Sequence, residues 1–372
     1  MDECVRVLDH MPERNPTEGT FELTIRCNLH CKMCLFRHDD SENAEIMAKE
    51  LTAEQWIDMA RQVAEAGTLS LLITGGEPML RPDFCEIWEG IYKLGFVLTL
   101  YTNATLVTPK IMETLRKYPP HKIGVTIYGA GPETYEKVTG SAAAFEKAIE
   151  GIRQLKTLPS QMEYRMTVIK DNYDDVAAVE NLVSRFDPEA LLINAQLVTK
   201  GVRGACADVD SCRLDPGEYI KLSVERGIRE LKTKLGARFS EGTVSIIKNE
   251  PECDSSSKEG VPTLFGCQAG MKSYTISWDG KLLGCQIMGS FAQETNAGFQ
   301  KAWDDFPYGV SLPPVCDTCH HCPLSEYCSL CAAFRFAETG TFTEAPSYIC
   351  KKTKKTYQFL SENGIVKEKH AL

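Results

Sequence analysis

Residues 51–78, LTAEQWIDMARQVAEAGTLSLLITGGEP, contain the pattern that decides the fold. The first part of this segment places apolar side chains at the spacing of one helix face: Trp56, Met59, Ala60, Val63 and Ala64. Gly67 ends that run, and the aliphatic residues 69–74 then have the composition of a strand. A helix that leads directly into a strand is the repeating unit of α/β proteins.

The same alternation extends over the first two hundred residues. Further helices are expected to begin near Asp83, Thr108, Ala142 and Tyr173. Strands are predicted at 21–27, 69–74, 96–102, 122–129, 162–170 and 190–198. Each crossover helix must return the chain in the same direction, so six such strands predict a parallel sheet and an α/β fold class. The loops that follow the strands then gather at one edge, where ligands bind.

Composition excludes several classes of protein. The chain has 372 residues, 43% of them hydrophobic, and a net charge of −10. A net acidic chain is poorly suited to a nucleic-acid backbone, and no apolar run approaches the roughly 20 residues that span a bilayer. The first residues, MDECVRVLDHMPERN, lack the pattern of a signal peptide. We therefore expect a cytoplasmic protein with neither nucleic acid nor membrane as a partner.

The sixteen cysteines are strongly clustered. Three lie between Cys27 and Cys34, and eight lie between Cys267 and Cys350. In a long chain without a secretion signal, such clusters indicate metal ligands rather than disulfides. From about Asn249 onward the sequence has little periodic apolar content, which fits a segment that folds around metal.

The first cluster, CNLHCKMC, follows the first predicted strand directly and contains Cys27, Cys31 and Cys34. Three thiolates on one short loop can hold three corners of a 4Fe–4S cubane and leave the fourth iron open to a substrate or cofactor. His30 is the competing candidate for that fourth position. A zinc site is the alternative for the whole cluster.

This CxxxCxxC spacing, together with TGGEP at 74–78, resembles the signature of the radical S-adenosylmethionine (radical SAM) superfamily. The resemblance implies a partial (β/α)6 TIM-like barrel whose 4Fe–4S cluster is held by Cys27, Cys31 and Cys34. It also implies an S-adenosylmethionine site, with Glu77 opposite the ammonium group of the cofactor. The residues that the resemblance assigns to this site are Met33, Gly75, Gly76, Glu77, Pro78, Asn103 and Thr126.

The second cluster resembles the SPASM domain, a C-terminal extension of many radical SAM enzymes. The resemblance implies one auxiliary 4Fe–4S cluster on Cys319, Cys322, Cys328 and Cys350. It implies a second cluster on Cys267, Cys285 and Cys331. The fourth iron of that cluster is bound by Cys316 or Cys253, or it has no protein ligand and is open to substrate. The alternative is a pair of zinc knuckles that include His320 or His321.

These patterns divide the chain into four predicted segments. Residues 1–200 form the partial barrel, 201–248 a linker and bridging helix, 249–350 the SPASM auxiliary-cluster domain, and 351–372 a C-terminal tail.

The resemblance implies a reaction as well as a fold. Reductive cleavage of S-adenosylmethionine gives a 5′-deoxyadenosyl radical that abstracts hydrogen, while the auxiliary clusters carry electrons or bind a substrate thiolate. SPASM-bearing relatives act mainly on peptides and proteins, so we expect a peptide substrate, modified by cross-linking or thioether formation during maturation of a ribosomally made product. A flavodoxin or ferredoxin would donate electrons. Only 26 residues precede Cys27, which predicts a separate leader-peptide-binding protein.

Two other functions fit the residues. One is dehydrogenation or epimerisation of a small, sugar-like alcohol, and the other is a zinc-binding interaction protein without enzymatic activity. Sulfatase-maturing relatives carry an aspartate base where this chain has Gln286, which argues against that branch. The pattern identifies no general acid or base, although Tyr128, Arg165 and Arg203 lie in or near predicted strands and are candidates to face a cavity.

Overall fold

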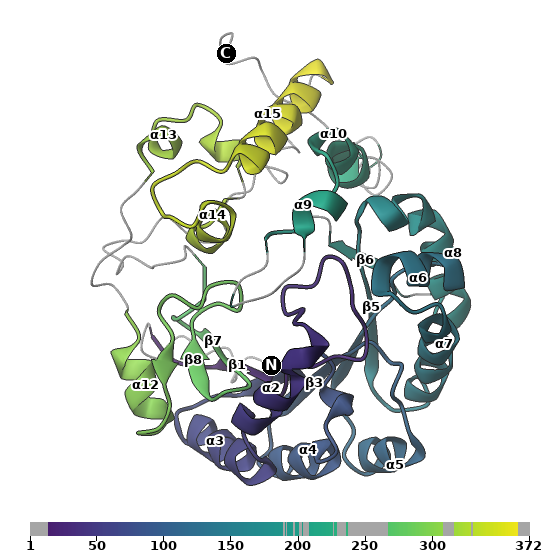
Figure 1. Cartoon of the computed structure of the whole chain (residues 1–372), viewed down its shortest axis with the longest axis vertical. Coiled ribbons are helices and arrows are strands. Elements are labelled where there is room, and N and C mark those ends of the chain that lie inside the picture. Colours follow the sequence, from purple (N-terminus) through teal and green to yellow (C-terminus); the bar gives the residue numbers. More distant parts are fainter. Residues whose placement is uncertain are drawn as a thin grey trace. The chain divides into compact units, whose positions relative to one another are not determined.

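The computed structural model describes residues 14–188, 190, 192–195, 198–200, 203, 208–225, 227–228, 236, 267–307, 316–328 and 330–363 (Figure 1). The chain divides into two compact units, Met1–Cys212 with Gln268–Tyr308, and Arg213–Cys267 with Gly309–Leu372. Within the described ranges, no helix has the length and apolar character needed to cross a membrane.

The first unit contains alternating strands and helices. Its strands are β1 (Glu18–Glu22), β2 (Ser70–Thr74), β3 (Val97–Thr102), β4 (Lys122–Thr126), β5 (Gln161–Thr167), β6 (Leu192–Ala195), β7 (Ser273–Ile276), β8 (Lys281–Leu283) and β9 (Gln293–Glu294). Its α-helices are α2 (Asn43–Lys49), α3 (Ala53–Glu65), α4 (Phe84–Tyr92), α5 (Pro109–Lys117), α6 (Pro132–Thr139), α7 (Ala143–Leu155), α8 (Val176–Phe186), α9 (Val209–Cys212) and α12 (Phe299–Asp305). Short 3-10 turns are η1 (Asp40–Glu42), η2 (Pro78–Leu80) and η3 (Lys170–Asp175).

These strands form one sheet in the order β6-β5-β4-β3-β2-β1-β7-β8-β9. The pairs from β1 to β6 are all parallel, which confirms the predicted α/β fold with a parallel sheet. β7 extends the sheet on the other side of β1 in the same direction, and β8 and β9 follow antiparallel. Residues 273–294, which the sequence analysis assigned to the C-terminal segment, therefore contribute three strands to the same sheet as the barrel strands.

Local signals explain where the helices begin. Thr52 and Gln55 form a capping box at the start of α3, and Thr108 caps α5 ahead of Pro109. In Figure 1 the helices α3, α4, α5, α7 and α8 follow one another along the outer side of the strands. Alternate residues of the strands, such as Leu98 and Leu100 in β3, are 2% exposed or less, as expected for a sheet with one face under helices.

The first strand differs from its predicted bounds of 21–27, because it ends at Glu22. Leu23 N still donates to Thr74 O, the last residue of β2, at 2.9 Å, and from Thr24 onward the backbone pairs with the loop after β2. Thr24 O accepts a hydrogen bond from Gly76 N at 2.7 Å, and Arg26 O accepts one from Glu77 N at 2.9 Å. Residues 23–26, which we call the exit of β1, are therefore fixed by hydrogen bonds where the chain leaves the sheet.

The second unit contains α10 (Pro216–Tyr219), which continues as the π-helical turn η4 (Ile220–Glu225), and α13 (Asp317–His320), η7 (Ser325–Tyr327), α14 (Ala332–Thr339) and α15 (Ser347–Glu362). The bridging helix predicted within 201–248 corresponds in part to α10 and η4, and most of residues 226–248 lie outside the described residues. Arg213 ties α14 to α15, since its Nη1 lies 2.8 Å from Glu338 and its guanidinium lies 3.9 Å from the ring of Tyr348.

Candidate active site at the cysteine loop

The three N-terminal cysteines lie on a loop that we call the cysteine loop, residues 27–34, directly beyond the exit of β1. The loop rests on the end of α6, because Thr139 O accepts a hydrogen bond from His30 N at 2.9 Å and Val138 O accepts one from Lys32 N at 3.0 Å. Cys34 N donates back to Cys31 O at 3.1 Å, which closes a tight turn between the last two cysteines.

The electrostatics of this loop fit a positively charged metal cluster. Burial raises the pKa of the Cys27 thiol well above its usual range, and the charges of Glu77 and Cys31 raise it further. Burial, followed by the charge of Cys34, raises the pKa of Cys31 to about 12. Thiols this costly to ionise need a cation beside them, and the irons of a cubane supply that charge.

No group of three or more His, Cys, Asp or Glu side chains converges on a single metal ion within the part of the chain that the structure describes. In a cubane each thiolate binds its own iron, so its ligands need not converge in this way. The competing ligand His30 has its Nε2 3.0 Å from Asp40 Oδ2, and its side chain is 43% exposed. That nitrogen is therefore engaged at the surface.

The two glycines of TGGEP are required because the loop after β2 lies directly against the backbone of residues 24–26. A Cβ on Gly75 would lie 2.2 Å from Thr24 O, and one on Gly76 would lie 2.3 Å from Arg26 O. Gly75 also has φ +142°, which L-residues rarely adopt. The glycines thus hold the loop after β2 against the chain that leads into the cysteine loop.

Glu77 is fully buried and joins this loop to the one after β3. Its Oε1 accepts hydrogen bonds from Thr102 Oγ1 (2.8 Å) and Met79 N (3.1 Å), and its Oε2 accepts one from Asn103 N (2.7 Å). Burial raises the pKa of Glu77 to about 7. A role of Glu77 opposite the ammonium group of S-adenosylmethionine stays a prediction.

Asn103 connects the loop after β3 to the cysteine loop. Its Nδ2 lies 3.7 Å from Cys27 Sγ and 3.0 Å from Asn28 Oδ1. The following residue, Ala104, has φ +60°, a backbone conformation that favours glycine. The structure therefore brings Cys27, Glu77 and Asn103, three predicted site residues, into one continuous set of contacts.

Other residues that the sequence singled out have different surroundings. Met33 is buried, and Thr126 ends β4 opposite Arg165 of β5. Among the three candidates to face a cavity, Tyr128 hydrogen-bonds to the thiol of Cys31. Arg165 instead packs over Tyr101, with 4.7 Å from its guanidinium carbon to the ring centroid.

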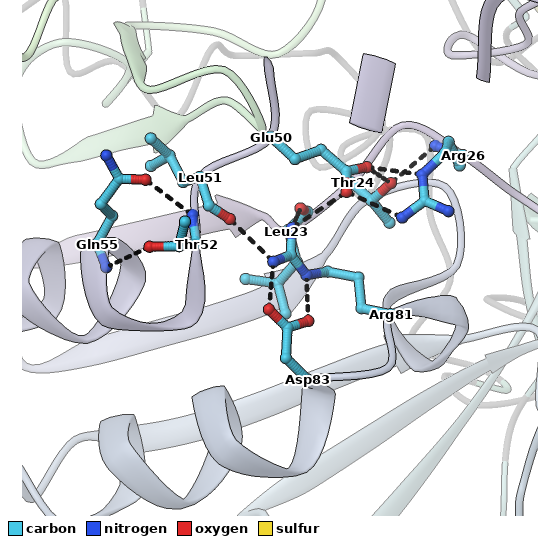
Figure 2. A network of polar contacts seen from close by, with 9 residues as sticks. All are labelled: Leu23, Thr24, Arg26, Glu50, Leu51, Thr52, Gln55, Arg81 and Asp83. Atoms are coloured by element: carbon cyan, nitrogen blue, oxygen red, sulfur yellow. Dashed lines mark hydrogen bonds and ion pairs between the residues drawn. The ribbon is translucent and has the colours of Figure 1, made fainter. Parts of the chain in front are cut away.

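Sequence reasoning missed an ionic network that holds the exit of β1 (Figure 2). Glu50 accepts hydrogen bonds from Thr24 Oγ1 and from Arg26 Nε and Nη2, both of the latter at 2.9 Å. Arg81 lies 3.3 Å from the same carboxylate and forms a two-pronged pair with Asp83 at 2.9 and 2.7 Å. Arg26 directly precedes Cys27, so this network fixes the start of the cysteine loop. No local pattern reveals pairs that are 24 to 31 residues apart.

A cavity of about 470 Å³ adjoins the cysteine loop. Ile25, Phe36 and His38 line both this cavity and a small hollow of about 20 Å³ whose wall includes Cys27 and Cys34. The remaining wall of the large cavity is formed by Arg203, Ser277, Trp278, Asp279, Lys281, Leu283, Gly289, Ala292 and Glu294. The cavity thus lies where the exit of β1 meets the β7–β8 hairpin.

Arg203, the third candidate, is part of this wall. Its Nη1 and Nη2 lie 2.8 and 2.9 Å from the carboxylate of Glu22, which is fully buried. Burial raises the pKa of Glu22, while the charge of Arg203 and hydrogen bonds from Arg203 and Gln286 oppose that rise. Gln286, at the position of the aspartate base in the sulfatase-maturing branch, therefore contacts a carboxylate that sequence reasoning had not singled out.

Several C-terminal cysteines lie together in the second unit. Burial raises the pKa of Cys350, and the charges of Cys328 and Cys322 add to the effect. Burial and a hydrogen bond with Cys316 raise the pKa of Cys319 to about 11. Cys322 and Cys328 are thus close enough to Cys350 to interact electrostatically, and Cys319 contacts Cys316, while the ligand set of this auxiliary cluster stays a prediction.

The other predicted auxiliary set is divided between the two units. Cys267 and Cys331 belong to the second unit and Cys285 to the first. Cys253 lies outside the described residues. This second ligand set therefore stays a prediction.

Comparison with known proteins identifies the family. The profile of the Radical SAM superfamily matches residues 21–183. An AdoMet-dependent heme synthase from Oleidesulfovibrio alaskensis is 31% identical over 355 residues, which cover 91% of this chain and 86% of that protein. The chain belongs to the radical SAM superfamily. An AdoMet-dependent heme synthase from Methanosarcina barkeri is 27% identical, with 88% of this chain and 94% of that protein covered.

Two further proteins that resemble this chain have names that refer to peptides. A PqqA peptide cyclase from Streptomyces rochei is 26% identical over 195 residues, 52% of each chain. The crystal structure of Streptococcus suis SuiB bound to its precursor peptide SuiA has a TM-score of 0.66 at 18% identity, covering 94% of this chain and 79% of that one. The second likeness shows a shared fold.

Membership in this superfamily makes the chain an enzyme of a class that binds S-adenosylmethionine and a 4Fe–4S cluster. The cysteine loop, with two thiols that burial makes costly to ionise and a neighbouring cavity, fits that cluster. The alternative of an interaction protein without enzymatic activity is therefore set aside.

Proposed function

We propose that this radical SAM enzyme abstracts a hydrogen atom from a peptide or protein substrate, as a step in the maturation of a ribosomally made product such as cross-linking or thioether formation. The observation that carries the proposal is the cavity beside the cysteine loop, whose wall mixes apolar side chains with charges of both signs. A peptide offers the same mixture of apolar groups, donors and acceptors. The names of the PqqA peptide cyclase and of the SuiB–SuiA complex support this substrate class.

The cofactors would be held by residues already described. Cys27, Cys31 and Cys34 would bind one 4Fe–4S cluster, and Cys319, Cys322, Cys328 and Cys350 an auxiliary one. Cys267, Cys285 and Cys331 would bind a further cluster. When bound, S-adenosylmethionine and the first cluster supply the radical chemistry. A flavodoxin or ferredoxin would donate electrons, and a separate protein would bind the leader peptide.

The chain's own residues position and enclose this chemistry. Glu77 and Asn103 fix two loops against Cys27, and the Glu50 network holds the backbone that leads into the cysteine loop. Ile25, Phe36, Trp278, Leu283 and Ala292 supply the apolar part of the cavity wall, where they would displace water from a bound substrate. Exclusion of water protects a reactive intermediate from side reactions.

A second candidate is chemistry on an iron tetrapyrrole. It is favoured by the relatives that match most of the chain, which are named AdoMet-dependent heme synthases. Such macrocycles carry several carboxylates and a wide apolar face. Asp279 and Glu294 in the cavity wall would repel those carboxylates, while Arg203 and Lys281 are already paired with Glu22 and Asp279, which supports the peptide.

The test compares substrates on one preparation of the enzyme. Anaerobically reconstituted, reduced protein is incubated with S-adenosylmethionine and short peptides encoded next to its gene, with Fe-coproporphyrin III, or with a deuterated sugar alcohol. We expect 5′-deoxyadenosine together with a mass change of the peptide. A mass change of the porphyrin alone, or deuterium transfer from the alcohol alone, would overturn the proposal.

A further inference from the structure

The charged side chains at the cavity beside the cysteine loop are two cations, Arg203 and Lys281, and three carboxylates, when Glu22 behind Arg203 is counted with Asp279 and Glu294. We propose that this cavity binds a positively charged side chain of the peptide, lysine or arginine, and that Glu294 is the residue that selects it. This inference rests on the proposed function and narrows the substrate to peptides with a cationic residue at or next to the modified position.

Both basic residues of the cavity wall already have partners. Arg203 donates two hydrogen bonds to Glu22, and its guanidinium carbon lies 4.8 Å from the centre of the Phe36 ring. Lys281 Nζ lies 2.8 Å from Oδ2 of Asp279, which belongs to the same wall. Neither cation is therefore available to attract a substrate carboxylate.

The acidic side of the wall is less completely paired. Asp279 accepts a hydrogen bond from Ser277 Oγ at 2.6 Å in addition to its contact with Lys281. Burial raises the pKa of Asp279, but the hydrogen bonds from Lys281 and Ser277 outweigh that effect and hold the pKa below its usual value, so the carboxyl stays charged. Glu294 has Lys281 as its ionic partner among the described residues, at 3.9 Å, and that ammonium is already engaged by Asp279.

Trp278 adds to the preference for a cation. Trp278 lines the same cavity with an aromatic ring, and an indole face attracts ammonium and guanidinium groups. The cavity wall thus contains a carboxylate and an indole ring, both of which attract cations.

The experiment measures binding, so that it does not depend on turnover. The probes are fluorescein-labelled decapeptide pools in which one central position is lysine, arginine, leucine or glutamate and the other positions are randomised among neutral residues. Fluorescence anisotropy is recorded on the reconstituted enzyme with S-adenosylmethionine present. We expect the lysine and arginine pools to bind about tenfold more tightly than the glutamate pool, a typical effect of one close charge pair.

Matched variants locate the effect. Glu294→Gln should remove the preference and Glu294→Lys should reverse it toward glutamate. Glu45→Lys, which makes the same charge change as Glu294→Lys on a 73% exposed helix position outside the cavity, should leave the preference intact. An equal response to Glu294→Lys and Glu45→Lys, or equal binding of all pools, would overturn the inference while leaving a peptide substrate in place. Binding of Fe-coproporphyrin III with no binding of any peptide pool would instead overturn the proposed function.

Discussion

Replacing Glu50 by glutamine tests whether the ionic network in Figure 2 holds the cysteine loop. The Glu50 side chain is 7% exposed and accepts hydrogen bonds from Thr24, Arg26 and Arg81. Glutamine keeps one oxygen but loses the negative charge, which leaves two buried guanidinium groups without their shared counter-charge. The residues that lose their anchor lead directly into Cys27.

The expected cost follows from the burial of the pair. Removing one partner of a buried ion pair destabilises a protein by about 3–5 kcal/mol. Arg81 keeps its contacts with Asp83, so we expect the lower end of that range, about 3 kcal/mol. For a unit of this size that corresponds to a decrease in the melting temperature of about 6–12 °C.

The assay is thermal unfolding followed by circular dichroism under anaerobic conditions, with iron per chain measured on the same samples. Glu45→Gln is the matched control, because the Glu45–Lys49 pair is exposed on α2 and such pairs contribute only a few tenths of a kcal/mol. We expect Glu50→Gln to lower both the melting temperature and the iron content, and Glu45→Gln to change neither. Equal melting temperatures for the two variants would refute the reasoning.

Three further predictions concern single sites. Gly76→Ala should destabilise the protein by about 1–3 kcal/mol in urea unfolding, because the new Cβ would lie 2.3 Å from Arg26 O, whereas Gly131→Ala meets no atom within 4 Å and should be tolerated. Burial raises the pKa of Glu77 to about 7, so the native state binds the proton of this carboxyl more tightly than the unfolded state does. The protonated carboxyl therefore contributes its full stabilisation below about pH 4.5, and this contribution is lost as the pH rises to about 7. Urea unfolding of iron-free protein at several pH values should show this loss, and Glu77→Gln should remove it. Cys350→Ser should lower the iron content by about four per chain, and an unchanged iron content would contradict the ligand set proposed for that auxiliary cluster.

The sequence predicts the parts of the fold that depend on local signals. β2 and β3 lie near their predicted bounds, α3 ends close to Gly67 and α5 begins next to Thr108, because apolar periodicity, glycine and the Thr108 cap act within a few residues. The bounds of β1 were wrong, since the pairing of residues 24–26 with the loop after β2 depends on a segment about fifty residues away. The addition of β7 to the sheet is likewise invisible locally, because its partner β1 lies some 250 residues earlier.

The same difference between local signals and long-range contacts applies to the candidate site. Cysteine spacing and TGGEP identified the cysteine loop and Glu77, because those motifs are contiguous in the chain. Glu22 was not found, since nothing in its strand indicates that Arg203, 181 residues later, pairs with it. The Glu50 network and the cavity also required the folded structure, because their members come from separate elements.

The most direct test of the account is the formation of 5′-deoxyadenosine from S-adenosylmethionine by the reduced, iron-loaded enzyme, compared with a variant in which Cys27, Cys31 and Cys34 are all alanine. The account predicts that the unaltered enzyme forms 5′-deoxyadenosine and that the variant forms none above background. Equal amounts from both proteins, or none from an unaltered enzyme with its full content of iron and sulfide, would contradict the assignment of the cysteine loop as the active site.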